Sequence, residues 1–118
     1  MITTLKFDFN HPGLNGKDGL MRAHFRTKKK WKDKISYIAL SQSLYRHPGK
    51  VKLTYIRKST GILDEDNLSA SRKHFLDALV GIGMIADDTK AVIVEKVEIQ
   101  EKCKMKDKGT VIIIEDVE

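Results

Sequence analysis

Alternation of hydrophobic and polar residues is the clearest pattern in the chain. It is cleanest near the start, where Leu5, Phe7 and Phe9 share one side and polar residues occupy the other. Alternation of this kind predicts a strand with one buried face. The unbroken apolar run in residues 110–114 instead predicts burial on both faces, by the core or in part by a second subunit. The segments that fit strands are residues 3–9, 51–57, 90–100 (where neither side is apolar throughout) and 110–114.

Two segments between these strands have the period of a helix. In residues 31–45, apolar side chains recur every three or four positions, and Thr27 offers a cap for an earlier start. The second helix is predicted to begin with a cap on Asp66 or Asn67 and to run to about Val80. Glycines follow it directly, and one of them is expected to adopt the left-handed conformation that ends a helix.

Together these segments predict one α+β domain over residues 1–118, with a mixed four-stranded sheet packed against two main helices. Residues 101–108 are predicted to form a charged hairpin turn between the last two strands. The single cysteine, Cys103, has no partner for an internal disulfide, and no segment has the pattern of a signal peptide or a membrane span. These features predict a reducing, cytoplasmic location and no membrane partner.

Charge is distributed unevenly along the chain. The net charge is +6, but residues 1–60 carry 14 Lys and Arg against three Asp and Glu, whereas residues 61–118 carry eight against 13. A lysine run at residues 28–30 lies near the predicted start of the first helix, where the helix dipole disfavours cations. A bound phosphate would relieve that repulsion, so the pattern favours a polyanionic partner. A solvated surface that only confers solubility explains the same charges.

An acidic cluster stands out in the second half of this basic chain. On an extended approach to the helix, Asp64 and Asp66 would point the same way while Glu65 points away. Lys73 shares a helical face with Asp66, and Asp88 enters from the turn after the helix. Carboxylates without His or Cys nearby are hard ligands that suit Mg²⁺ or Mn²⁺. The same residues also fit ordinary helix caps and turns.

Other kinds of chemistry have little support in the sequence. No serine or cysteine nucleophile motif and no glycine-rich nucleotide loop is visible, so no nucleotide cofactor is expected. The histidines are scattered without the spacing of metal ligands, and surface roles are expected for them. They are His11, His24, His47 and His74.

The chain resembles the RusA-type Holliday junction resolvases, which are small dimeric Mg²⁺-dependent endonucleases of phages, prophages and bacteria. The order and spacing of three motifs carry the resemblance, over about a third of the chain: Asp64-x-Asp66-Asn67-Leu68, Lys73-His74-Phe75-Leu76-Asp77-Ala78-Leu79 and Gly83-x-Ile85-x-Asp87-Asp88. The loop that begins at His11-Pro12-Gly13 is similar, more loosely, to the family's Pro-Ser-x-Asn loop.

The resemblance implies roles for individual residues. It implies metal ligation and catalysis by Asp64, Asp66 and Asp88, phosphate stabilisation by Lys73, and supporting roles for Asp87 and Asn67. In the founding members the lysine follows the second aspartate by four residues, a position that Ala70 occupies here. Counting back from Asp77 assigns Lys73, as though one helical turn had been inserted, and Arg72 is the competing cation.

We therefore expect a Mg²⁺-dependent endodeoxyribonuclease (Mn²⁺ as a possible substitute) that resolves four-way DNA junctions in recombination and repair by phosphodiester hydrolysis. Two symmetric nicks call for a two-fold homodimer. The alternatives are a non-catalytic nucleic-acid-binding protein with the same fold, or a metal-dependent nuclease or phosphatase on other substrates, including other branched DNA. The cations expected to contact the DNA backbone are Lys17, Arg22, Arg26, Lys28, Lys29, Lys30, Lys32 and Lys34.

Overall fold

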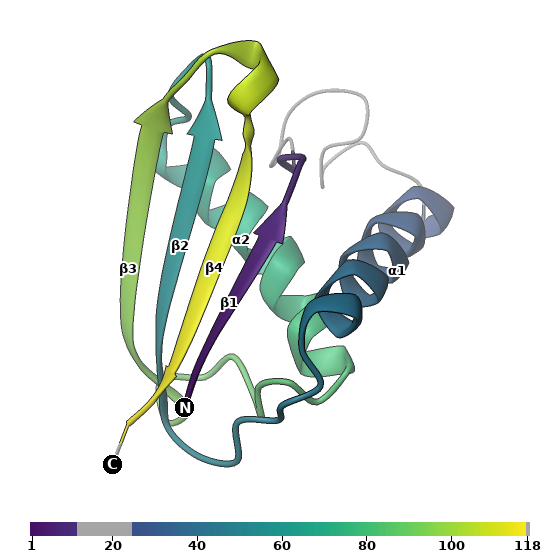
Figure 1. The fold of residues 1–118 in the computed structure, drawn as a ribbon, viewed down its shortest axis with the longest axis vertical. Helices are drawn as coiled ribbons and strands as arrows, with labels where there is room; N and C mark the ends of the chain where they lie inside the picture. The colour runs from purple at the N-terminus through teal and green to yellow at the C-terminus, as the bar shows by residue number, and fades with distance from the viewer. Residues whose placement is uncertain (12–24, 118) are drawn as a thin grey trace.

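The computed structural model describes residues 1–11 and 25–117 and confirms the α+β prediction. A four-stranded mixed sheet packs against two helices (Figure 1). The elements in chain order are β1 (Ile2–Phe7), α1 (Phe25–Gln42), β2 (Val51–Ser59), α2 (Glu65–Gly81), β3 (Ile93–Lys102), the 3₁₀ turn η1 (Met105–Asp107) and β4 (Gly109–Asp116). Within the described ranges, neither helix has the length and apolar composition that a membrane span requires.

The strand order is β1-β4-β2-β3. β4 pairs antiparallel with both β1 and β2, whereas β2 and β3 are parallel. The prediction that residues 101–108 form a hairpin turn between β3 and β4 is therefore wrong. β2 lies between β3 and β4 in the sheet, and the segment with η1 crosses the end of β2. The error arose because a charged segment of this length between two strands fits a hairpin and a crossover equally well.

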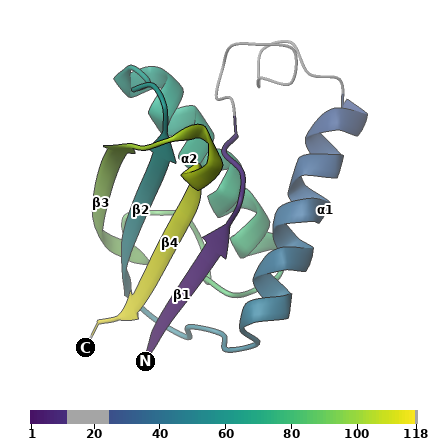
Figure 2. The same cartoon turned by 45° about the horizontal axis from the view of Figure 1, so that its top comes forward.

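Both helices lie on the same side of the sheet, and the opposite side is covered by no described helix (Figures 1 and 2). The core fills the space between sheet and helices. Its largest fully buried apolar side chains come from all the main elements except β3: Leu5, Ile35, Leu53, Tyr55, Phe75, Leu79, Met84, Ile85, Ile112 and Ile114. The alternation seen in residues 3–9 and 51–57 thus sorts side chains into a core face and an open face, as predicted.

β4 bears on the prediction of burial on both faces. Within the single chain the core buries only Ile112 and Ile114, while Val111 and Ile113 on the open face are half-exposed. β4 lies between two other strands, and its edges are covered by hydrogen bonds. Burial of its second face by the core is therefore wrong, and burial by a second subunit stays a prediction.

The helix starts also differ from the predictions. α1 begins at Phe25, so Thr27 lies inside the first turn and does not cap it. α2 is capped by Asp64 and not by Asp66 or Asn67: its Oδ1 accepts the backbone N–H of Asn67 at 2.8 Å. Asp66 therefore lies within the first turn of the helix. The predicted glycine-assisted end of α2 is confirmed, because Gly83 has a positive φ of 76°.

β3 contains a bulge that the sequence pattern did not reveal. Ile93 pairs with Val51 and Glu95 pairs with Lys52, so that Val94 is an extra residue between them. One extra residue reverses which side of the sheet every later residue faces. Beyond the bulge, the apolar side chains of β3 consequently face away from the helices.

Candidate DNA and cation site between the helices

A groove of about 790 Å³ runs between α1 and α2. We call it the α1–α2 groove. Most of its lining is charged: the residues are Lys28, Lys29, Lys32, Asp33, Lys73, His74, Asp77, Val80, Gly81, Asp87 and Asp88. Four lysines and four aspartates therefore line the groove, with three of the lysines on α1 and Lys73 on α2.

Two ion pairs lie along the groove, each between residues one helical turn apart. Lys29 Nζ lies 3.5 Å from Asp33 Oδ2 on α1, and Lys73 Nζ lies 3.7 Å from Asp77 Oδ1 on α2. All four side chains are about half or more exposed. Exposed pairs of this kind add little stability, so their lysines remain available to an incoming anion at low cost.

A second hollow of about 340 Å³ adjoins the groove on the β3 side of α2. We call it the β3 hollow; its lining is Ser69, Ala70, Arg72, Lys73, Leu76, Asp88 and Lys96. Lys73 and Asp88 line both spaces and so stand between them. These two residues are 15 positions apart in the chain, and both the spacing of the acidic cluster and the family resemblance grouped them in one predicted site.

Positive charge also surrounds Asp88 within the β3 hollow. Burial lowers the pKa of Arg72, while Tyr55 and the carboxylate of Asp88 oppose that shift. Burial likewise lowers the pKa of Lys96, with Arg72 adding repulsion and Asp88 opposing the shift. Arg72 forms an ion pair with Glu98 on β3, which directs its guanidinium toward the sheet. Lys73 extends into both spaces and is the better placed of the two candidate cations.

The predicted carboxylates are only partly brought together. Asp64 Oδ1 accepts hydrogen bonds from both the backbone N–H and the side-chain amide of Asn67, at 2.8 and 3.0 Å. Asp66 is exposed on the first turn of α2, about one turn before Ala70 in the β3 hollow. Among residues 1–11 and 25–117, no three His, Cys, Asp or Glu side chains form a group that could hold a metal ion. The expectation that Asp64 and Asp66 approach on an extended segment is wrong, because the helix begins one residue after Asp64.

The predicted DNA-contacting cations on α1 divide into two sets. Lys28, Lys29 and Lys32 line the α1–α2 groove, and Lys30 and Lys34 line a smaller hollow beside Trp31. Lys34 Nζ lies 4.0 Å from the centre of the Phe9 ring, in a cation–π contact that holds it at the surface of the core. Arg26 is exposed, and Lys17 and Arg22 lie outside the described residues.

No protein-family model and no curated protein matches this chain. The assignment of roles therefore rests on the residues themselves and on their arrangement.

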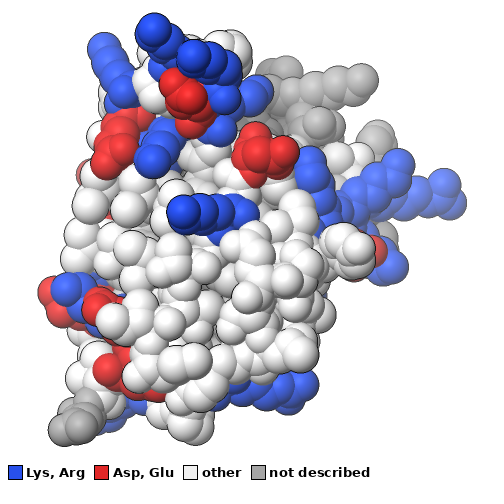
Figure 3. Space-filling view, in the orientation of Figure 1, with Lys and Arg blue, Asp and Glu red and all other residues white. Residues whose placement is uncertain are grey.

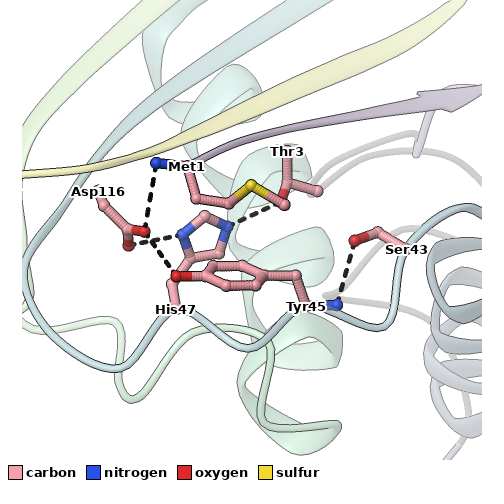
Figure 4. Close-up of polar contacts among 6 residues, drawn as sticks. All are labelled: Met1, Thr3, Ser43, Tyr45, His47 and Asp116. Atoms are coloured by element: carbon pink, nitrogen blue, oxygen red, sulfur yellow. Dashed lines mark hydrogen bonds and ion pairs between the residues drawn. The ribbon is translucent and has the colours of Figure 1, made fainter.

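Sequence reasoning missed a buried polar network that joins β1, β4 and the turn after α1 (Figure 4). His47 Nδ1 lies 2.8 Å from Asp116 Oδ1, and His47 Nε2 lies 2.8 Å from the Thr3 hydroxyl. The Tyr45 hydroxyl donates to the other Asp116 oxygen at 2.9 Å, and the Met1 amine lies 3.7 Å from it. The hydrogen bond from His47 holds the pKa of Asp116 below its usual value.

The order Asp116–His47–Thr3 matches the hydrogen-bond order of hydrolase triads. Thr3 is only 4% exposed and His47 only 2%, so a substrate has no access to the hydroxyl. Because an ionised carboxylate only accepts, His47 Nδ1 carries a proton and donates it to Asp116. The network thus ties three segments of the fold together, and the expected surface role of His47 is wrong.

His11 and His74 are also buried, contrary to expectation. Their rings stack at 3.9 Å, and the edge of the Trp31 ring packs on His11. Burial, aided by the nearby His74, lowers the pKa of His11 to about 3. The signal was present in the sequence: His11 continues the inward alternation of Phe7 and Phe9. His24 lies outside the described residues.

Proposed function

We propose that this chain is a Mg²⁺-dependent endodeoxyribonuclease that cleaves branched DNA, with four-way junctions as the preferred substrate. Lys73 and Asp88 carry the proposal, since both line the α1–α2 groove and the β3 hollow, beside the lysines of α1. The RusA-type motif pairs the same two residues in catalysis. A sequence resemblance and a spatial arrangement therefore favour the same site.

The donor chemistry of the site fits Mg²⁺. Asp87 and Asp88 line the groove and Asp66 lies on the first turn of α2; all three offer only oxygen ligands, which Mg²⁺ prefers. Mg²⁺ in phosphoryl-transfer sites commonly uses one or two carboxylates, several waters and the substrate's own phosphate oxygens. A single chain without a three-carboxylate group among its described residues is compatible with a site that DNA completes. When bound, the ion would supply charge stabilisation at the scissile phosphate and an activated water.

The chain's own residues then have separate tasks. The lysines of α1 bind the phosphate backbone without reading base sequence. Lys73 forms an ion pair with Asp77. It would also neutralise the negative charge that develops on the phosphate during cleavage. Asp88, which lines both the groove and the β3 hollow, would be a ligand of Mg²⁺. Two such sites on a homodimer would produce the paired nicks that junction resolution needs.

A cleavage assay with labelled immobile four-way junctions tests this function. Wild-type protein with Mg²⁺ is expected to introduce symmetric paired nicks in junctions and to leave linear duplex of the same sequence intact. The Asp66→Asn variant is expected to bind junctions and not to cut them. Absence of nicks from the wild type, with Mg²⁺ or with Mn²⁺, would refute the nuclease; cleavage that survives Asp66→Asn would refute this assignment of the site.

A non-catalytic DNA-binding role is the second candidate. It is favoured by one observation, that no three potential ligands are grouped among the described residues. Salt-sensitive binding of junctions without cleavage by any divalent cation would support this candidate over the nuclease.

A further inference from the structure

The face of the sheet opposite the helices carries an apolar patch. We define this open-face patch by five side chains: Ile56, Val97, Ile99, Val111 and Ile113. All are half-buried or exposed, with Ile99 at 38% exposure. Figure 3 views this face and shows a broad uncharged area, with most of the charged side chains toward its ends.

We propose that the open-face patch is the interface of a two-fold homodimer, in which a second copy of the chain packs sheet against sheet. The need for two copies rests on the proposed function, but the choice of surface follows from the sheet alone. The two-fold axis runs parallel to the strands, between β4 and β2.

β3 supplies the first argument. In a two-layer domain, apolar residues of a strand face the helices and polar residues face solvent. β3 does the reverse: Lys96, Glu98 and Gln100 face the helix side, whereas Val97 and Ile99 face outward beside Ile56. An exposed apolar patch built on an edge strand favours association with another protein surface.

The charges at one end of the face supply the second argument, because their pattern indicates that the partner is a second copy of the chain. Glu115 and Lys52 are paired neighbours on the two central strands, and Glu95 follows on β3. A two-fold axis parallel to the strands exchanges β4 with β2, so each Glu115 faces the partner's Lys52. The same operation places Val111 against the partner's Ile56. The face is thus self-complementary, as an interface between identical copies requires.

The alternative axis, perpendicular to the strands, is unfavourable. It exchanges the two ends of each strand and so places Lys52 opposite the partner's Lys58, and Glu95 opposite the partner's Glu101. Like charges that face each other across an interface weaken association. The charge pattern therefore selects the parallel axis.

The size of the face sets the expected affinity. Four strands at a spacing of about 4.8 Å, with about 20 Å of strand length, give a plan area of roughly 400 Å² for each copy. Surface relief enlarges this area, and the total still lies toward the small end of specific interfaces. We expect reversible association rather than a permanent dimer.

Sedimentation velocity without DNA, from about 1 to about 300 μM protein, measures this association directly. Wild type is expected to shift from monomer to dimer within that range. Ile99 distinguishes the two axes, since the parallel axis places it against the partner's Lys6, whereas the perpendicular axis places it against the partner's β3. Ile99→Lys is expected to weaken the dimer at least about tenfold, and Ile99→Glu, which is equally polar, several-fold less.

Tyr37→Lys serves as the control, because Tyr37 is 77% exposed on α1 and away from the sheet. It is expected to leave association unchanged.

A wild type that stays monomeric throughout, or a dimer unaffected by both Ile99 variants, would overturn the proposed surface. Equal weakening by Ile99→Lys and Ile99→Glu would overturn the axis. Circular dichroism of each variant verifies folding. The nicking assay is scored separately, so a dimer without nicks would refute the nuclease and leave the interface standing.

Discussion

Two polar clusters in this chain use similar residue types in opposite ways. In the His47 network, both ring nitrogens of His47 meet a partner at hydrogen-bond distance, and the imidazole is buried. In the α1–α2 groove, lysines and aspartates remain exposed and are held only by weak ion pairs. The comparison teaches that triad-like order alone does not indicate chemistry. The exposure of its charged side chains makes the groove, and not the His47 network, the candidate for binding a ligand.

The largest expected effect falls on activity in the groove. Asp88→Asn should reduce Mg²⁺-dependent nicking of junctions by on the order of 10²–10³-fold, because it removes one ligand charge beside the scissile phosphate. Single-turnover cleavage at saturating protein measures it. Asp107→Asn, on η1 and outside the groove, should cut at the wild-type rate. If the two variants cut equally well, Asp88 has no role in catalysis.

The second prediction concerns stability in the His47 network. His47→Ala should lower the free energy of unfolding by about 2–3 kcal/mol, because Asp116 and Thr3 both lose a buried hydrogen-bond partner. Urea denaturation followed by circular dichroism measures this change. Tyr45→Phe removes one half-exposed hydrogen bond and should cost about 1 kcal/mol or less. If His47→Ala lost nuclease activity without losing stability, the His47 network would have a functional and not a structural role.

The third prediction uses pH to show that buried histidines are structural. The pKa of His11 is about 3 in the folded chain, below its ordinary value of 6.5, so the unfolded chain binds a proton that the folded chain does not. The contribution of His11 to the free energy of unfolding is therefore complete above pH 6.5, and it is lost progressively as the pH drops toward 3. The slope should approach about 1.4 kcal/mol per pH unit. Urea denaturation between pH 4 and pH 8 should show this slope reduced in His11→Gln, and an unchanged slope would contradict it.

The smallest effect is expected for DNA affinity. The double variant Lys28→Ala/Lys32→Ala should weaken junction binding about tenfold, and it should reduce the salt dependence of the logarithm of the affinity by about two units of slope. Fluorescence anisotropy across a salt series provides the measurement. Lys104→Ala/Lys106→Ala removes the same charge near η1, where no groove residue lies, and should change the slope less. Equal changes in both would mean that only net charge matters.

The parts of the fold that the sequence predicted are those with local signals. β1 and β2 alternate because each buries one face, and α2 ends where Gly83 permits a positive φ. The strand order could not be predicted from the sequence, because the pairing of β4 with β1 and β2 depends on contacts between residues as far apart as Ile2 and Glu115. The cap on Asp64 was missed because three neighbouring polar residues are all good caps.

The sequence named the residues of the candidate site, but it did not predict where all of them lie. Lys73 and Asp88 share two hollows, as the family motif implies. The position of Asp64 as a helix cap was not foreseeable from spacing, because it depends on where the helix begins. The His47 network was invisible for a different reason: it joins residues 44 and 69 positions apart, and no short-range pattern records such a contact.

The bulge at Val94 implies that β3 holds one residue more than its pairing needs. Deleting Val94 would leave Ile93 paired with Val51 and Glu95 paired with Lys52, so the eight residues that follow would keep their sides of the sheet. Glu98 would remain beside Arg72, and Val97 and Ile99 would still face outward. Straightening the bulge without a deletion would instead turn each of these residues to the other side. Deletion of Val94 should therefore be tolerated, with folding, activity and dimerisation retained, although it removes a residue from inside a strand.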